Sequence, residues 1–151
     1  MNGGTRESVL WYDGTQASAG EVAPSSRLDP HRPSLAPILA RMTGDAAVWV
    51  DAGWDHILLE ADRRLAAIDP DYEVHQVKEK YGGLRYYCSL DRHPEGYRVI
   101  AEAELEAARS CERCGEPGEI DRQTPYIRTL CPAHREEHHF DQQVCQRLRT
   151  R

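Results

Sequence analysis

The stretch CERCGEPGEIDRQTPYIRTLCPAH, residues 111–134, decides the fold of the C-terminal part of this chain. It separates Cys111 from Cys114 by two residues, and after a spacer of sixteen residues it separates Cys131 from His134 by two residues again. Two ligand pairs at this distance are typical of a site for one tetrahedral metal ion of the zinc type. We therefore expect one Zn²⁺ bound by four protein ligands, a closed coordination sphere that indicates a structural ion.

The residues around the ligand pairs predict the local fold. Gly115 directly follows Cys114 and suits a tight knuckle, where the backbone often needs a positive φ. The spacer is long enough for a short β-hairpin, and Pro132 suits the first turn of a helix that carries His134. We therefore expect a treble-clef zinc finger and C-terminal helix over residues 111–151.

The predicted C-terminal helix carries two further features. His138 lies one turn beyond His134 and is the alternative fourth ligand; without either histidine, three cysteines would leave an open site. An apolar face continues along the helix at Phe140, Val144 and Leu148. Cys88 and Cys145 stay outside the ligand set, and unpaired thiols beside a metal site favour a reducing compartment over a disulfide framework.

Upstream, the pattern predicts a body over residues 33–110 in which helices pack on a β-hairpin. Apolar residues at helical spacing predict helices over residues 34–43, with Ser34 as the N-cap, over residues 54–68 and over residues 94–110. Asp69-Pro70 ends the second of these, which has the most regular apolar stripe. Trp49 and Trp54 are expected in the core or as anchors. The fold class is α+β.

Residues 72–90, YEVHQVKEKYGGLRYYCSL, predict the hairpin, with its turn at Gly82-Gly83. The face expected to cover the helices holds His75, Val77, Glu79, Tyr81, Leu84, Tyr86, Cys88 and Leu90. The opposite face holds Val74, Gln76, Lys78, Lys80, Arg85, Tyr87 and Ser89. Lys78, Lys80 and Arg85 could bind phosphates while Tyr87 stacks on a base, although the same pattern also describes an ordinary solvated face.

Composition limits the function classes. The chain has 151 residues and a net charge of −6, and no segment is strongly basic, so non-specific electrostatic binding to nucleic acid is not the default interpretation. Residues 1–32 are poor in apolar side chains, and we expect a mobile N-terminal arm. The chain has neither an N-terminal apolar run typical of a signal peptide nor one long enough to span a membrane, which favours the cytoplasm.

Three motifs together suggest a family. VKEKYGGLRYY (77–87), AEAELEAARSCERCGEPG (101–118) and TLCPAH (129–134), preceded by Gly53-Trp54, resemble a group of small bacterial and phage-encoded proteins of unassigned function. The resemblance covers roughly residues 53–135. It implies an α+β unit with a zinc finger, and it carries no activity over to this chain.

Three function classes follow. The first is a non-enzymatic interaction or regulatory module that binds a protein partner, such as a phage or bacterial accessory factor; it fits the acidic charge and the lack of a recognisable catalytic set. The second is a nucleic-acid-binding module that uses Lys78, Lys80, Arg85 and Tyr87. The third is a metal-dependent, nuclease-like enzyme, suggested by the surplus His138-His139, although no paired histidine and asparagine complete such a site.

Overall fold

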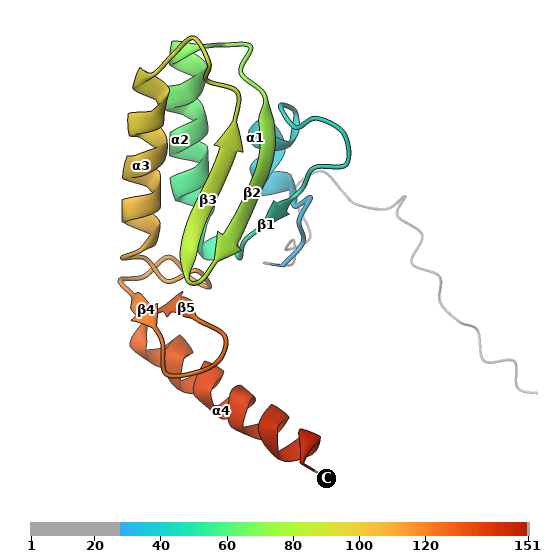
Figure 1. Ribbon diagram of the computed structural model, residues 1–151, viewed down its shortest axis with the longest axis vertical. Coiled ribbons are helices and arrows are strands. Elements are labelled where there is room, and N and C mark those ends of the chain that lie inside the picture. Colours follow the sequence, from blue (N-terminus) through green and yellow to red (C-terminus); the bar gives the residue numbers. More distant parts are fainter. Residues whose placement is uncertain (1–27, 151) are drawn as a thin grey trace, which may run out of the picture.

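The computed structural model describes residues 28–150, which form an α+β fold (Figure 1). The mobile arm expected over residues 1–32 lies almost entirely outside the described residues. Its last residue, Arg32, is described: the side chain is fully buried and its guanidinium lies 2.5 Å from the Asp55 carboxylate. Arg32 therefore belongs to the body and not to a mobile arm.

The body contains eight elements in chain order. They are the 3₁₀ turn η1 (Pro33–Leu35), helix α1 (Ala36–Leu39), strand β1 (Val48–Trp49), the 3₁₀ turn η2 (Ala52–Trp54), helix α2 (Asp55–Ile68), strands β2 (Val74–Lys80) and β3 (Gly83–Cys88), and helix α3 (Glu95–Ala107). The predicted helices over 54–68 and 94–110 are confirmed as α2 and α3. The first helix is shorter than predicted, and Ser34 does not cap it, because its hydroxyl donates to Asp55 instead.

A three-stranded sheet lies beside these helices, in the order β1-β2-β3. Strand β2 pairs antiparallel with β3, as the hairpin pattern predicts, and parallel with the two-residue β1. The sheet and the helices enclose one core, to which η1, α1, α2 and α3 all contribute buried side chains. Trp54 is fully buried in this core, as expected, whereas Trp49 is 62% exposed, so its expected place in the core is wrong. Trp49 lies next to Lys78 across the β1–β2 pair, on the opposite face from buried Val48.

The hairpin turns one residue earlier than predicted. Glu79 pairs with Leu84 and Lys80 with Gly83, so the two loop residues are Tyr81 and Gly82. Both have a positive φ, 52° and 80°, which is the backbone of the tight turn that suits a right-twisted hairpin. Tyrosine rarely adopts this conformation, and the sequence pattern therefore favoured the two glycines.

The two faces of the hairpin follow the prediction except at the turn and at the start of β2. Tyr81, expected on the face that covers the helices, lies in the turn and is 70% exposed. A β-bulge between Val74 and Gln76 adds His75 as an extra residue. As a result, Val74 is fully buried and His75 is exposed, the reverse of the predicted assignment.

The C-terminal part contains strands β4 (Glu119–Asp121) and β5 (Arg128–Leu130), which pair antiparallel, and helix α4 (Pro132–Arg149). It lies at the end of the body where the β2–β3 hairpin turns, and α4 runs away from the body toward the C-terminus (Figure 1). Within the described range 28–150, no helix combines the length and the apolar character that crossing a bilayer requires.

Candidate metal centre

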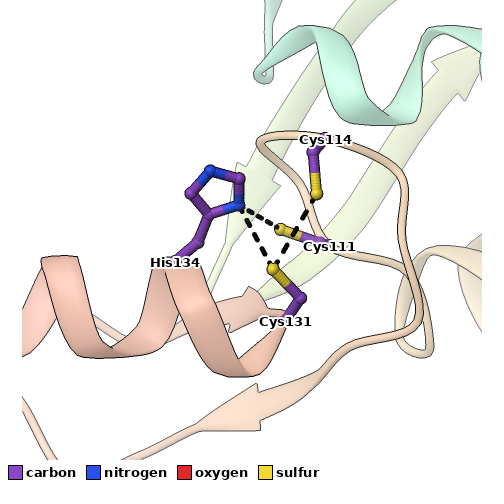
Figure 2. Close-up of side chains that lie close together, drawn as sticks. All are labelled: Cys111, Cys114, Cys131 and His134. Carbon is purple, nitrogen blue, oxygen red and sulfur yellow. Dashed lines mark hydrogen bonds between the residues drawn. The ribbon is translucent and has the colours of Figure 1, made fainter.

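Four side chains from two separate segments converge beside the start of α4. Cys111 and Cys114 lie on the loop that follows α3, Cys131 directly precedes α4, and His134 lies in the first turn of α4 (Figure 2). Their ligand atoms all lie within 4.8 Å of one another, so one ion could contact all four. The structure thus brings together the four residues that the spacing predicted as ligands.

The distances between these atoms can be compared with a tetrahedral metal site. With metal–sulfur bonds of about 2.3 Å and metal–nitrogen bonds of about 2.0–2.1 Å, tetrahedral angles require sulfur–sulfur distances of about 3.8 Å and sulfur–nitrogen distances of about 3.6 Å. Cys114 Sγ lies 3.8 Å from Cys131 Sγ, and His134 Nδ1 lies 3.4 Å from Cys111 Sγ and 3.3 Å from Cys131 Sγ. These three distances lie within about 0.3 Å of the tetrahedral values, and the other pairs of ligand atoms lie within 4.8 Å of each other, so shifts of up to about 1 Å would enclose such an ion.

The position of Cys131 favours its thiolate. Cys131 is the N-cap of α4, beside the backbone N–H groups of the first turn that have no partner within the helix. Although desolvation opposes the effect, hydrogen bonds from the backbone N–H groups of His134 and Ala133 and from the neighbouring thiols lower the pKa of the Cys131 thiol. By contrast, desolvation and the thiols of Cys111 and Cys131 raise the pKa of Cys114 to about 11. A bound cation must displace that proton, so metal affinity should increase as the pH rises.

The Cys111–Cys114 loop rests directly on the body at Gly53. The Gly53 N–H donates to the Glu112 carbonyl oxygen at 2.8 Å, and the Trp54 indole N–H donates to the Ser110 carbonyl oxygen at 2.8 Å. A Cβ atom at residue 53 would lie 2.4 Å from the carbonyl oxygens of Cys111 and Glu112. Only glycine fits at this position, and the approach fixes the loop that carries two of the ligands.

The turn of the β2–β3 hairpin makes a second contact with the metal centre. The hydroxyl of Thr129, which is fully buried, donates to the Gly82 carbonyl oxygen at 2.6 Å. In turn, the Glu112 N–H donates to the Thr129 carbonyl oxygen at 2.9 Å, which joins the ligand loop to β5. The body, the ligand loop and the β4–β5 hairpin are therefore connected through a continuous set of hydrogen bonds, from both backbone and side-chain donors.

Charged side chains are buried at the same junction. Arg128 of β5 lies between two carboxylates, 3.1 Å from Asp51 and 2.8 Å from Glu112. Burial, and to a smaller extent the charge of Asp51, raises the pKa of Glu112 to about 7 despite the neighbouring Arg128. These three side chains join residues before α2, after α3 and on β5, and no local pattern along the chain predicts that they meet.

The other histidines of α4 do not join the ligand group. His138 is buried, and its Nε2 lies 3.0 Å from both the Thr124 hydroxyl and the Tyr126 carbonyl oxygen. His139 Nε2 lies beside the Asp121 carboxylate. His138 therefore holds the loop between β4 and β5 against α4, and His139 holds the end of β4 there. The alternative in which His138 replaces His134 has no support in this geometry.

The predicted binding face of the hairpin lies on the three-stranded sheet, away from the metal centre's ligands. Lys78 and Arg85 are directly opposite each other on β2 and β3, Tyr87 lies within reach of Lys78, and Lys80 is the last residue of β2. Trp49 extends the Lys78–Arg85 row onto β1. Sequence reasoning missed Trp49 because a two-residue strand has no periodicity of its own.

No family model, curated protein or solved structure matches this chain.

Proposed function

We propose that Cys111, Cys114, Cys131 and His134 bind one Zn²⁺ as a structural ion, and that residues 111–151 form a treble-clef finger. Three thiolates and one imidazole suit zinc, and all four tetrahedral positions are filled by protein. The order of ligand loop, β4–β5 hairpin and helix, with the last ligand in the first turn of α4, supports the treble clef. Three thiolate ligands and the free thiols of Cys88 and Cys145 also suit the reducing cytoplasm.

The whole chain, in this proposal, is a zinc-stabilised interaction module that binds a protein partner, a role suited to a bacterial or phage accessory factor. One observation carries the proposal: an apolar stripe on α4 has no cover within the described residues. Phe140 is 66% exposed and Leu148 is 67% exposed, with Val144 between them at the same helical spacing. An uncovered stripe of this kind marks a surface for another protein.

The surroundings of the stripe indicate the chemistry of the partner. Two shallow grooves flank Phe140, and Glu136 lines both of them while Asp141 lines one. Arg147 and Arg149 lie in the last turn of the same helix. The partner should therefore offer an apolar helix face with basic groups opposite the Phe140 end and acidic groups opposite the C-terminal end. An antiparallel second copy of α4 would also meet these requirements.

The zinc in this scheme fixes the base of α4, because Cys131 and His134 anchor the first turn of the helix to the ligand loop. Loss of zinc should therefore loosen the docking helix as well as the finger.

The test compares the zinc-loaded chain with a double variant, Phe140→Asp/Leu148→Asp. Burial of each of these side chains contributes about 1.5–3 kcal/mol, so losing both should weaken the complex by about 100-fold or more. Leu105→Asp is the matched control, because Leu105 is 64% exposed on α3, away from the stripe. Zinc content and circular dichroism confirm that all three proteins are folded.

Each protein is immobilised and exposed to a bacterial lysate, and any retained protein is then purified and titrated against it. The proposal requires a purified partner that binds the wild type and Leu105→Asp equally and loses at least about 100-fold in affinity for the double variant. Light scattering on the chain alone would identify a second copy as the partner if a dimer forms and the double variant is monomeric. A monomer whose partners bind the double variant unchanged would refute the role of the stripe.

A further inference from the structure

A second surface, made by different elements from α4, combines aromatic and cationic side chains. It is the face of the β1–β2–β3 sheet that points away from the helices, and we call it the outer sheet face. Its members are Trp49 on β1, Gln76, Lys78 and Lys80 on β2, and Arg85 and Tyr87 on β3. We propose that the outer sheet face binds single-stranded nucleic acid, with Trp49 and Tyr87 stacking on bases and the three cations contacting phosphates.

The aromatic side chains are placed for stacking. Trp49 is 62% exposed and Tyr87 is 45% exposed, although the other faces of their strands are packed into the core. They lie on the two outer strands of the sheet, which are about 10 Å apart with β2 between them. A flat sheet that presents two separated aromatic rings is an arrangement on which neighbouring unpaired bases can stack.

The cations lie between and beside these rings. Lys78 is in register with Trp49 on one side and with Arg85 on the other, so one row across the sheet reads Trp49–Lys78–Arg85. The Lys78 ammonium lies 5.7 Å from the centre of the Tyr87 ring. A backbone that crosses this row would meet a positive charge beside each stacked base.

The charges of this face are not neutralised by the protein. Among residues 28–150, Lys78, Lys80 and Arg85 take part in no ion pair, whereas Arg32, Arg41 and Arg128 are each paired with a carboxylate. The chain as a whole carries a net charge of −6, so a face that gathers three such cations has a charge opposite in sign to that of the whole chain. Charge complementarity therefore favours a polyanion as the occupant.

The exposed rings select the form of the polyanion. In a duplex the base faces are stacked on one another, and only unpaired bases can offer a face to Trp49 or Tyr87. A protruding helix is a usual means of reading the grooves of a duplex, and the outer sheet face points away from the helices. This site goes beyond the proposed protein-binding role, because it shares no residue with the stripe on α4.

Fluorescence anisotropy of the full zinc-loaded chain with labelled oligonucleotides tests the proposal. The probes are single-stranded DNA and RNA of about twelve nucleotides and a duplex of the same length. Three phosphate contacts on a single strand give a slope of about −2 in the dependence of log K on log salt. The affinity should therefore fall about 20-fold between about 50 and 200 mM salt, and the duplex should bind more weakly than the single strands.

Variants of the outer sheet face locate the binding. Trp49→Ala and Tyr87→Ala should each weaken binding by about 10-fold or more, and Lys78→Glu/Arg85→Glu should abolish it and its salt dependence. Tyr87→Phe keeps the ring and should bind like the wild type. Tyr97→Ala and Arg98→Glu are the controls, because both side chains are exposed on α3, and they should change nothing.

Three results would overturn the proposal that the outer sheet face binds single-stranded nucleic acid. The absence of binding at about 50 mM salt would overturn the proposal, as would binding that Trp49→Ala and Tyr87→Ala leave intact while both proteins retain zinc and native circular dichroism. Equal affinity for duplex and single strands would rule out stacking as its basis. None of these results bears on the stripe of α4, which is tested with separate variants.

Discussion

The close approach at Gly53 makes Gly53→Ala the most informative single substitution for the docking of the metal centre. An added Cβ would lie 2.4 Å from the carbonyl oxygens of Cys111 and Glu112 and 2.6 Å from the backbone nitrogen of Cys114. All three are backbone atoms, so no side chain can rotate away. The ligand loop must move by about 1 Å to restore ordinary contact distances.

The cost can be worked out from two contributions. Overpacking of this kind costs about 1–3 kcal/mol, and displacement of the loop would also break the hydrogen bond from the Gly53 N–H to Glu112, which contributes about 1 kcal/mol. We expect the free energy of unfolding to fall by about 2–4 kcal/mol in total. Because Cys111 and Cys114 move with the loop, we also expect faster metal release to a chelator.

Urea unfolding of the zinc-loaded proteins, followed by circular dichroism, measures the first effect, and a colorimetric chelator measures the second. Gly44→Ala is the control for a glycine substitution without a clash: Gly44 has a φ of +63° and nothing within 4 Å of an added Cβ, so the substitution costs only the strain of a positive φ, about 1 kcal/mol. Gly53→Ala does not add this strain, because the φ of Gly53 is not positive. If Gly53→Ala is no less stable than Gly44→Ala and releases metal at the wild-type rate, the account of how the metal centre docks is wrong.

Three further predictions concern the ligands, the free thiols and the core. Cys114→Ser should lose bound zinc and the fold of the metal centre, whereas Cys145→Ser, on the exposed part of α4, should retain both; metal analysis and circular dichroism distinguish these results. Burial raises the pKa of the Cys88 thiol to about 11. At pH 7.5 the thiolate fraction of Cys88 should therefore be roughly 100-fold or more below that of an ordinary thiol, and its rate of alkylation by iodoacetamide should be lower by the same factor. In the native zinc-loaded protein, mass spectrometry should therefore find Cys145 alkylated before Cys88, and the alkylation rate of Cys88 should increase as the pH rises toward 11. Equal alkylation rates for the two cysteines would contradict the burial of Cys88. Tyr72→Phe removes the buried hydroxyl that lies between Asp62 and Tyr86, and it should lower the free energy of unfolding in urea by about 2–3 kcal/mol, while a loss below about 0.5 kcal/mol would mean that this hydrogen-bond network contributes little.

The ligand set could be predicted from the sequence because its information is local. Each pair of ligands lies within four residues, and Pro132 after Cys131 indicates where the helix begins. The helices α2 and α3 were predictable for a related reason, since their apolar stripes extend over several turns. In these segments, spacing along the chain and position in space are closely linked.

The docking of the metal centre was less accessible to sequence reasoning. Gly53, Gly82 and Thr129 come from distant parts of the chain, and their roles depend on the approach of backbones that no spacing describes. Gly53 and Gly82 are the points where the body meets the metal centre.

The wrong predictions for the β-sheet also have local causes. Tyr81 takes a positive φ that sequence statistics assign to glycine, and the bulge at His75 reverses the inward and outward positions at the end of β2. Trp49 was expected in the core or as an anchor, as tryptophans usually are, and strand β1 is too short for a periodic signal that could have placed it on the exposed face. Its exposed position adds a second aromatic ring to the face that the sequence had marked only by Lys78, Lys80, Arg85 and Tyr87.

A titration of the metal-free protein with Co²⁺, followed by visible absorption, tests the central claim most directly. Cobalt reports on coordination geometry, and zinc should then displace it. We predict one equivalent per chain with the intense absorption of a tetrahedral site and charge-transfer bands from thiolates; His134→Ala should change this spectrum, and His138→Ala should leave it intact. A weak octahedral spectrum, a stoichiometry other than one, or a spectrum that depends on His138 and not on His134 would contradict the assignment of Cys111, Cys114, Cys131 and His134 as the metal ligands.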